Sequence, residues 1–280
     1  MKNVMLPLLL TSAPLFAGVE APIMAPPAPD CEAGFTLGLE ALYLKAYQSE
    51  GRYDDADYEF GGRGSVGYDF NDCLFVKASY FGYEADVSHF GEDVQGGSIG
   101  EDADLKVSYL DLVVGEHFKP SEKLTLSPYV GLRWATFEEG TDFRAIDPRG
   151  AELHQSQESD FSGLGVVVGI DATRALGSGF SLYGTAKQSI VFGTTDHNFS
   201  QSSSGVLTDK SLSLDRGDFS DDRVLYITEL GLGGQYDFHF GSVAGNIRAG
   251  VEGQWWAGLS DDSSENAGLA GFVLGANFKF

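Results

Sequence analysis

Three stretches of the sequence hold acidic residues and histidines at spacings that general acid–base catalysis could use. They are Asp55-Ala56-Asp57, Asp237-Phe238-His239 and Asp196-His197. A carboxylate pair, or a carboxylate beside an imidazole, can move a proton when both groups come within about 3 Å of the reacting atoms, directly or through one water. The sequence has no nucleophile motif, metal-ligand spacing or cofactor motif to support such a site. Whether the pairs can meet depends on the elements that carry them.

The last fourteen residues, 267–280, alternate between the two faces of an extended strand. One face holds only apolar residues and glycine, whereas the other ends on Asn277 and Lys279. A tilted strand that crosses a membrane needs about 9–11 residues with one apolar side. Phe278 and Phe280 resemble the C-terminal assembly signal of bacterial outer-membrane barrels, so this strand predicts such a barrel.

Nine further segments alternate in the same way. After the start of the chain, the sequence has no run of about 18 apolar residues that would form a membrane-spanning helix. An even number of strands suits an antiparallel barrel with both chain ends on one side. The ten predicted strands are Gly34–Gln48, Ala56–Asp69, Cys73–Ala85, Leu105–His117, Lys123–Glu138, Glu158–Ala172, Gly179–Gly193, Asp222–Asp237, Val243–Ala257 and Ala267–Phe280.

The links between these strands are alternately short and long. Outer-membrane barrels have this asymmetry, with short periplasmic turns and longer external loops, whereas a soluble β-sandwich has no physical reason for it. We therefore predict an all-β fold, a transmembrane antiparallel up-and-down β-barrel of about ten strands over residues 34–280. It would lie in the bacterial outer membrane with both termini in the periplasm. The short links are Phe70–Asp72, Phe118–Glu122, Thr173–Ser178 and Phe238–Ser242, and the long ones are Ser49–Asp55, Asp86–Asp104, Glu139–Gln157, Thr194–Asp221 and Gly258–Asn266.

This topology keeps the acid–base candidates apart. Asp55 and Asp57 lie beside an external link, and Asp237 and His239 lie at a periplasmic turn, so the membrane separates the two groups. The Asp-His pair in the fourth long link has no partner motif. We therefore predict that the protein is not an enzyme.

The chain begins as an export signal does. Lys2 precedes an apolar stretch, and small residues lie near Ala17, where a peptidase could cut. Two prolines interrupt the stretch, which is shorter than the roughly 20 residues that a membrane helix needs. We predict a signal peptide over residues 1–17 and a Pro-rich periplasmic lead over residues 18–33.

The two cysteines flank the first predicted hairpin. Cys31 lies just before the first strand and Cys73 just after the first short turn, so both would lie at the periplasmic rim. Because the periplasm is oxidising, we predict a disulfide between them.

Charged residues of both signs fall on the face of the predicted strands that opposes the apolar one. A charge at the lipid face would cost about 2–4 kcal/mol at the bilayer midplane, so this face must line the lumen. The charges would either pair and plug a narrow barrel or line a narrow watery passage. The predicted lumen charges are Glu40, Arg63, Lys77, Asp111, Arg133, Lys187, Glu229, Arg248 and Glu252.

Short stretches in five strands are similar to the Legionella-type major outer membrane protein family. The resemblance covers nearly the whole mature chain and implies pore formation, and it carries no catalytic residues. The stretches are Glu40–Ala46, Gly62–Tyr68, Tyr109–Leu112, Pro128–Ala135 and Arg248–Trp256.

The chain is strongly acidic, with a formal net charge of −23, and most of the excess lies in the long links. These acids either form a solvated loop surface or make an acidic mouth that concentrates cations. We predict a porin-like outer-membrane protein that passes small, cationic solutes through a narrow lumen. The alternative is a closed structural or adhesive barrel whose acidic loops bind an external partner.

Partners and cofactors follow from the same charge and location. Expected partners are outer-membrane lipid, lipopolysaccharide and the barrel-assembly machinery, with divalent cations as candidates at the acidic links. Nucleic acid is not expected for so acidic a surface, and no cofactor is expected.

Overall fold

The computed structural model describes residues 31–48, 57–92, 97–147, 150–204, 212–259 and 266–280. The predicted signal peptide and residues 18–30 of the predicted lead lie outside these residues. Within the described ranges, no helix is long and apolar enough to cross a membrane. The described strands are β1 (Gly34–Gln48), β2 (Tyr58–Asp69), β3 (Leu74–Glu92), β4 (Ser98–Glu116), β5 (Phe118–Ser121), β6 (Leu124–Ile146), β7 (Glu152–Gly177), β8 (Phe180–Ser204), β9 (Leu212–Phe240), β10 (Val243–Ala257) and β11 (Ala267–Lys279).

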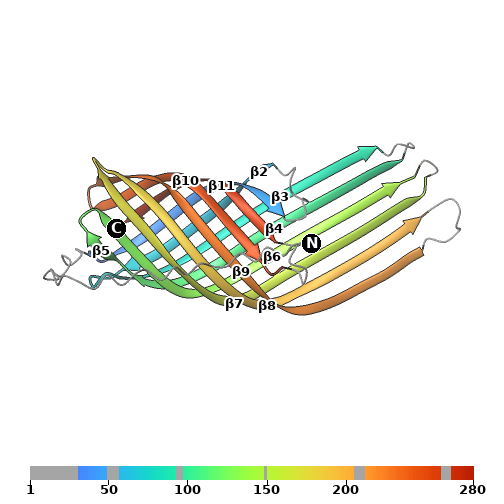
Figure 1. Cartoon of the computed structure of the whole chain (residues 1–280), viewed down its shortest axis with the longest axis horizontal. Helices are drawn as coiled ribbons and strands as arrows, with labels where there is room; N and C mark the ends of the chain where they lie inside the picture. Colours follow the sequence, from blue (N-terminus) through green and yellow to red (C-terminus); the bar gives the residue numbers. More distant parts are fainter. Residues whose placement is uncertain (1–30, 49–56, 93–96, 148–149, 205–211, 260–265) are drawn as a thin grey trace, which may run out of the picture.

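Ten of these strands form a closed antiparallel barrel, and β5 is a short extra strand beside β6 (Figure 1). Apart from β4 and β5, strands that follow each other in the chain pair with each other, β4 pairs with β6, and β1 pairs with β11 to close the ring. The closing pair runs from Thr36 opposite Lys279 to Gln48 opposite Ala267. The predicted all-β up-and-down barrel is therefore confirmed. We call the end with the tight turns the short-turn end and the other the long-loop end.

Three hairpins are much longer than predicted. The outer parts of β3–β4, β6–β7 and β8–β9 project beyond the other four strands at the long-loop end (Figure 1). We call these outer parts the projecting sheet. Pairing continues as far as Glu92 opposite Ser98 and Ile146 opposite Glu152.

The prediction of loops over 86–104, 139–157 and 194–221 was therefore wrong for most of their length. Inward and outward residues still alternate in the segments that lie past the membrane, but the outward residues there are charged instead of apolar. Pairing between the strands therefore continues. The predicted link 118–122 likewise contains β5.

Outward-facing side chains form an apolar belt around the barrel. In β6, Val130, Leu132 and Trp134 are about half exposed, and Glu138 follows on the same face toward the long-loop end. A continuous band of exposed apolar side chains on a closed barrel indicates contact with lipid. The change from Trp134 to Glu138 therefore marks the edge of the belt in this strand.

Inward-facing glycines make room for aromatic rings that lie against the barrel wall. A Cβ atom at Gly250 would lie 2.5 Å from the hydroxyl of Tyr183, and one at Gly233 would lie 2.7 Å from a carbon of the same ring. Tyr183 can therefore lie flat across β9 and β10. Flat rings leave space in the lumen that upright rings would fill.

Candidate functional site

The structure places all nine predicted lumen charges on inward-facing positions of their strands. Eight of them line one cavity inside the barrel, and Arg133 lies buried beside it. The inward phase is set by the two-residue period of each strand, which the sequence already shows. Which charges meet depends on how the ten strands are staggered around the barrel.

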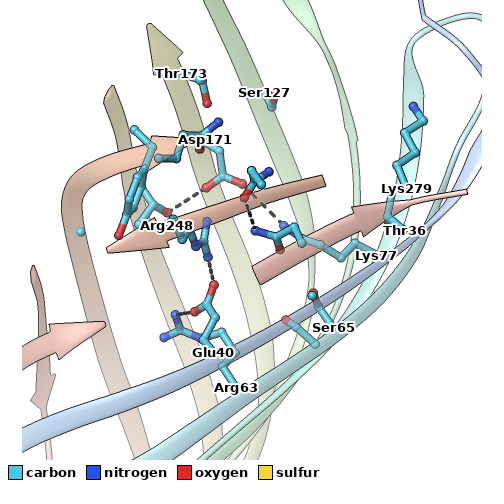
Figure 2. A pocket seen from close by; sticks show the side chains of 18 of the residues that line it. Thr36, Glu40, Arg63, Ser65, Lys77, Ser127, Asp171, Thr173, Arg248 and Lys279 are labelled. Atoms are coloured by element: carbon cyan, nitrogen blue, oxygen red, sulfur yellow. Dashed lines mark hydrogen bonds and ion pairs between the residues drawn. The ribbon is translucent and has the colours of Figure 1, made fainter. Parts of the chain in front are cut away.

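Arg63 is the centre of one half of a charged network. Its Nη1 donates to Glu40 at 2.8 Å, and its Nη2 contacts Glu252 at 2.5 Å and Glu229 at 3.6 Å. Arg248 forms an ion pair with the same Glu40 (Figure 2). One guanidinium thus joins carboxylates from β1, β9 and β10.

Arg133 organises the other half. Its Nε and Nη2 donate to the two carboxylate oxygens of Asp111 at 2.6 and 2.7 Å, and its Nη1 lies 2.6 Å from Glu229. Lys187 lies 3.3 Å from Glu229, and the hydroxyl of Tyr109 donates to Glu229 at 2.7 Å. Glu229 therefore bridges the two halves. We call the whole network the ion-pair layer.

An apolar layer closes the lumen directly above the ion-pair layer, toward the long-loop end. On β1, Leu42 and Leu44 follow Glu40 on the inward face, and on β10 Trp256 follows Glu252 and the buried Gln254. All three apolar side chains have no exposed surface. They belong to one cluster of buried residues contributed by many strands. This buried cluster therefore fills the barrel at this level in this conformation.

Below the ion-pair layer lies a cavity of about 550 Å³, which we call the vestibule. It extends from the ion-pair layer to Asp69, His117 and His239 near the ends of β2, β4 and β9. The vestibule therefore faces the short-turn end. Lys77 is the one predicted lumen charge outside the ion-pair layer. It lies in the wall of the vestibule and contacts Asp171 at 3.5 Å (Figure 2).

Polar contacts and a disulfide at the rim of the vestibule join segments that are far apart in the sequence. Lys279 contacts Asp69 at 2.7 Å, which links β11 to β2, and the Sγ atoms of Cys31 and Cys73 lie 2.11 Å apart in a disulfide. The backbone N–H of Phe280 donates to the carbonyl of Phe35 at 3.0 Å. The last residues of the chain are thus held against the first strand.

The structure keeps the acid–base candidates apart. Asp55 lies outside the described residues, and Asp57 lies at the long-loop end just before β2. Asp237 and His239 line the vestibule at the opposite end. The third pair lies on β8, where neighbouring residues point to opposite faces of the sheet.

Sequence reasoning missed Tyr109, Asp171 and Asp69 as members of the lumen network. Tyr109 shares its strand face with Asp111, two residues along, so the phase of the strand could have identified it. Asp69 points inward as Arg63 does on the same strand, and Asp171 points inward as Val167 does on its strand. Both aspartates lie where the predicted strands end. The phase of a strand end is difficult to read because few residues remain to define it.

The outward face of the projecting sheet is acidic. Glu138, Asp160 and Asp196 lie side by side on β6, β7 and β8, in register across the sheet. Like charges directly opposite each other destabilise a sheet.

Within the described ranges, no group of three His, Cys, Asp or Glu residues has the geometry to hold a metal ion.

Three solved structures with a similar arrangement are distant in sequence. The outer membrane protease OmpT from Escherichia coli is 9% identical with a TM-score of 0.44, covering 88% of this chain and 96% of that chain. A major outer membrane protein from Thermus thermophilus is 16% identical with a TM-score of 0.37, covering 89% and 99%. The toluene transporter TodX from P. putida is 13% identical with a TM-score of 0.34, covering 90% of each chain.

Sequence comparison gives a clearer relationship. No curated protein matches the chain. Residues 27–280 match the family of the Legionella pneumophila major outer membrane protein precursor. This match spans every strand of the barrel.

Proposed function

The chain belongs to the Legionella major outer membrane protein family and is a β-barrel of the bacterial outer membrane, and we propose that it is a porin-like protein whose passage is closed at rest. Small solutes would cross when the ion-pair layer and the apolar layer rearrange. The short-turn end would face the periplasm, because outer-membrane barrels have short periplasmic turns.

The ion-pair layer is the observation that carries this proposal. Buried ion pairs are seldom more stabilising than apolar side chains of similar volume. The apolar layer fills the barrel with buried side chains that carry no charge. Ionisable groups within a membrane-spanning structure typically mark ion or solute pathways. Passage of solutes therefore explains the ion-pair layer better than closure alone.

The acidic face of the projecting sheet supports a preference for cations. These carboxylates lie on the outward face of the sheet and act on ions that approach the long-loop end, because an acidic surface raises the local concentration of cations and repels anions by several kT. The ion-pair layer itself adds little preference, because Arg63, Arg133, Lys187 and Arg248 are balanced by Glu40, Asp111, Glu229 and Glu252. Selectivity would therefore come from the mouth.

Single-channel conductance in a planar bilayer with a potassium chloride gradient tests the proposal. We expect brief steps from the folded protein, with a reversal potential shifted toward that of potassium. Trp256→Ala removes the largest fully buried side chain of the apolar layer and should lengthen the open periods. Trp255→Ala is the matched control, because the neighbouring Trp255 points outward into the lipid belt and is 47% exposed.

Two results would contradict the proposal. One is a silent membrane for the wild type and for Trp256→Ala, with folding verified by the shift in electrophoretic mobility on heating. The other is a reversal potential shifted toward that of chloride, which would remove the cation preference. Asp160→Asn with Asp196→Asn should reduce the cation shift without changing the step frequency.

A second candidate is a closed structural or adhesive barrel. The acidic projecting sheet favours it, since this surface stands above the lipid belt where an external partner could reach it. Divalent cations would be partners of suitable charge, and they could bridge the acidic sheet to the anionic groups of lipopolysaccharide. Phe278 and Phe280 would serve only assembly of the barrel. Silence of both tryptophan variants, together with partner binding that Asp160→Asn and Asp196→Asn weaken, would select this function.

A further inference from the structure

The ion-pair layer exposes its cations to the vestibule and hides its carboxylates. The side chains of Arg248, Lys187 and Arg63 are 26%, 12% and 10% exposed, whereas those of Glu40 and Glu229 are 5% and 2% exposed. All five residues line the vestibule. Because the apolar layer closes the other side, the exposed surface of these cations faces the vestibule.

The three cations converge because they share carboxylates. Arg63 and Arg248 both contact Glu40, as Figure 2 shows. Arg63 and Lys187 both contact the same oxygen of Glu229, at 3.6 and 3.3 Å. Their cationic groups therefore lie around one region, which we call the vestibule floor.

Carboxylates elsewhere in the vestibule already have cationic or hydrogen-bonding partners. Asp171 contacts Lys77 at 3.5 Å and accepts a hydrogen bond from Thr185 at 2.8 Å. Asp69 contacts Lys279 at 2.7 Å. Lys77 and Lys279 offset the charges of Asp171 and Asp69, and Asp237 accepts hydrogen bonds from Ser181 and Gln235 at 2.9 and 2.8 Å. Within the ion-pair layer, the groups that an entering anion meets are therefore the exposed cations of the floor.

We propose that the vestibule floor binds the carboxylate or phosphate group of a small solute that enters from the short-turn end. Two guanidinium groups and one ammonium suit an oxyanion, because the planar guanidinium donates paired hydrogen bonds to carboxylate and phosphate oxygens. The vestibule volume of about 550 Å³ is within the usual range for small-molecule pockets. This site goes beyond the proposed function, because it is a pocket of the closed barrel and requires no conduction.

Isothermal titration calorimetry with citrate tests the site in the refolded full chain. The protein would be held in a zwitterionic detergent at low ionic strength, because salt screens such contacts. We expect one citrate site per chain. Arg248→Gln should weaken citrate binding at least tenfold, whereas Arg248→Lys, which keeps the charge, should weaken it less.

Lys106→Gln is the matched control. It removes the same charge from the outward face of β4, on the side of the strand that points away from the lumen, where Lys106 pairs with Glu84 at 3.2 Å. Citrate binding should be unchanged in this variant. Each variant is first checked for heat-modifiable electrophoretic mobility, so that loss of binding is measured on folded barrels.

Absence of citrate binding by the folded wild type would overturn the inference. So would equal citrate affinity of the wild type and Arg248→Gln, or equal weakening in Lys106→Gln, since both indicate attraction without a built site. Calorimetry does not depend on conductance, so a silent bilayer would count against the proposed function and leave this site untouched.

Discussion

Arg133 shows how completely a single charge depends on its partners in this barrel. Its side chain has no exposed surface and is held by Asp111 and Glu229, while its guanidinium carbon lies 3.7 Å from the centre of the Tyr109 ring. Taking a charge out of water costs several kcal/mol, which ion pairs and hydrogen bonds must offset. The residue is therefore stable there only as a member of the network.

We expect Arg133→Ala to lower the free energy of unfolding by about 3–5 kcal/mol, because it leaves buried carboxylates without a partner. Denaturant titration of the protein in lipid vesicles measures this change. The double variant with Asp111→Ala should be less destabilised than the sum of the two single variants. A loss of less than about 1 kcal/mol for Arg133→Ala, a value typical of surface pairs, would show that the network relaxes easily.

At the scale of the strand, β10 places glycine on both faces for different reasons. Gly250 faces inward beneath Tyr183, whereas Gly253 faces the lipid, and a Cβ there would lie 4.0 Å from the carbonyl oxygen of Leu269. The inward glycine is required by close packing. The outward glycine is not required by the barrel's own packing.

Gly250→Ala should therefore lower stability by about 1–3 kcal/mol, as overpacking of a close contact does. Gly253→Ala on the same strand should change it by no more than about 0.5 kcal/mol. The same denaturant titration compares the two variants. Equal effects would mean that the flat position of Tyr183 does not depend on Gly250.

The β3–β4 hairpin of the projecting sheet contains a carboxylate with a perturbed pKa. Partial burial raises the pKa of Asp104 above its ordinary value, and the nearby Asp86, Asp142 and Glu84 raise it further, against the opposing effect of Lys106. A raised pKa means that the ionised form is less favourable in the folded hairpin than in the open one. Ionised Asp104 therefore destabilises the hairpin above its folded pKa, and the effect is relieved as the pH falls through that pKa.

Asp104→Asn should protect the hairpin at neutral pH. Asp86 lies directly opposite Asp104, and removal of one such like-charge contact is worth about 0.2–1 kcal/mol. Hydrogen exchange, corrected for the intrinsic rate at each pH, measures opening of β3 and β4. The difference between variant and wild type should shrink as the pH falls, and a difference that grows instead would contradict this assignment.

At the scale of the whole molecule, the apolar belt fixes the position of the barrel in the bilayer. Leu132 lies in the belt on the outward face of β6. Thr136 lies on the same face, two residues beyond Trp134 toward the acidic projecting sheet. An arginine at the midplane of such a belt costs about 2–4 kcal/mol, falling to about 0–1 near the interface.

Leu132→Arg should therefore destabilise the folded protein in vesicles by about 2–4 kcal/mol and Thr136→Arg by about 0–1 kcal/mol. The two variants carry the same new charge on the same strand, so their difference reports depth in the membrane. Equal costs would show that the edge of the belt lies elsewhere.

The sequence by itself determined the fold class and the inward phase of the lumen charges. Each strand has a period of two residues, so one apolar face and one polar face can be read locally, without knowing the neighbours. The strict alternation of short and long links then predicted the up-and-down order. The lengths of β3, β4 and β6 to β9 were underestimated, because their outward residues become charged where the lipid ends while strand pairing continues.

Only the tertiary structure decided which charges meet and which side chains fill the lumen. Arg63 and Glu252 are 189 residues apart in the chain and lie within hydrogen-bonding distance because β1 and β11 close the ring between their strands. Leu42 and Trp256 point inward, as the charged residues of their strands do. The strands alone therefore do not show that these two side chains form a separate closing layer. The stagger of ten strands around one barrel sets those levels, and no single strand carries that information.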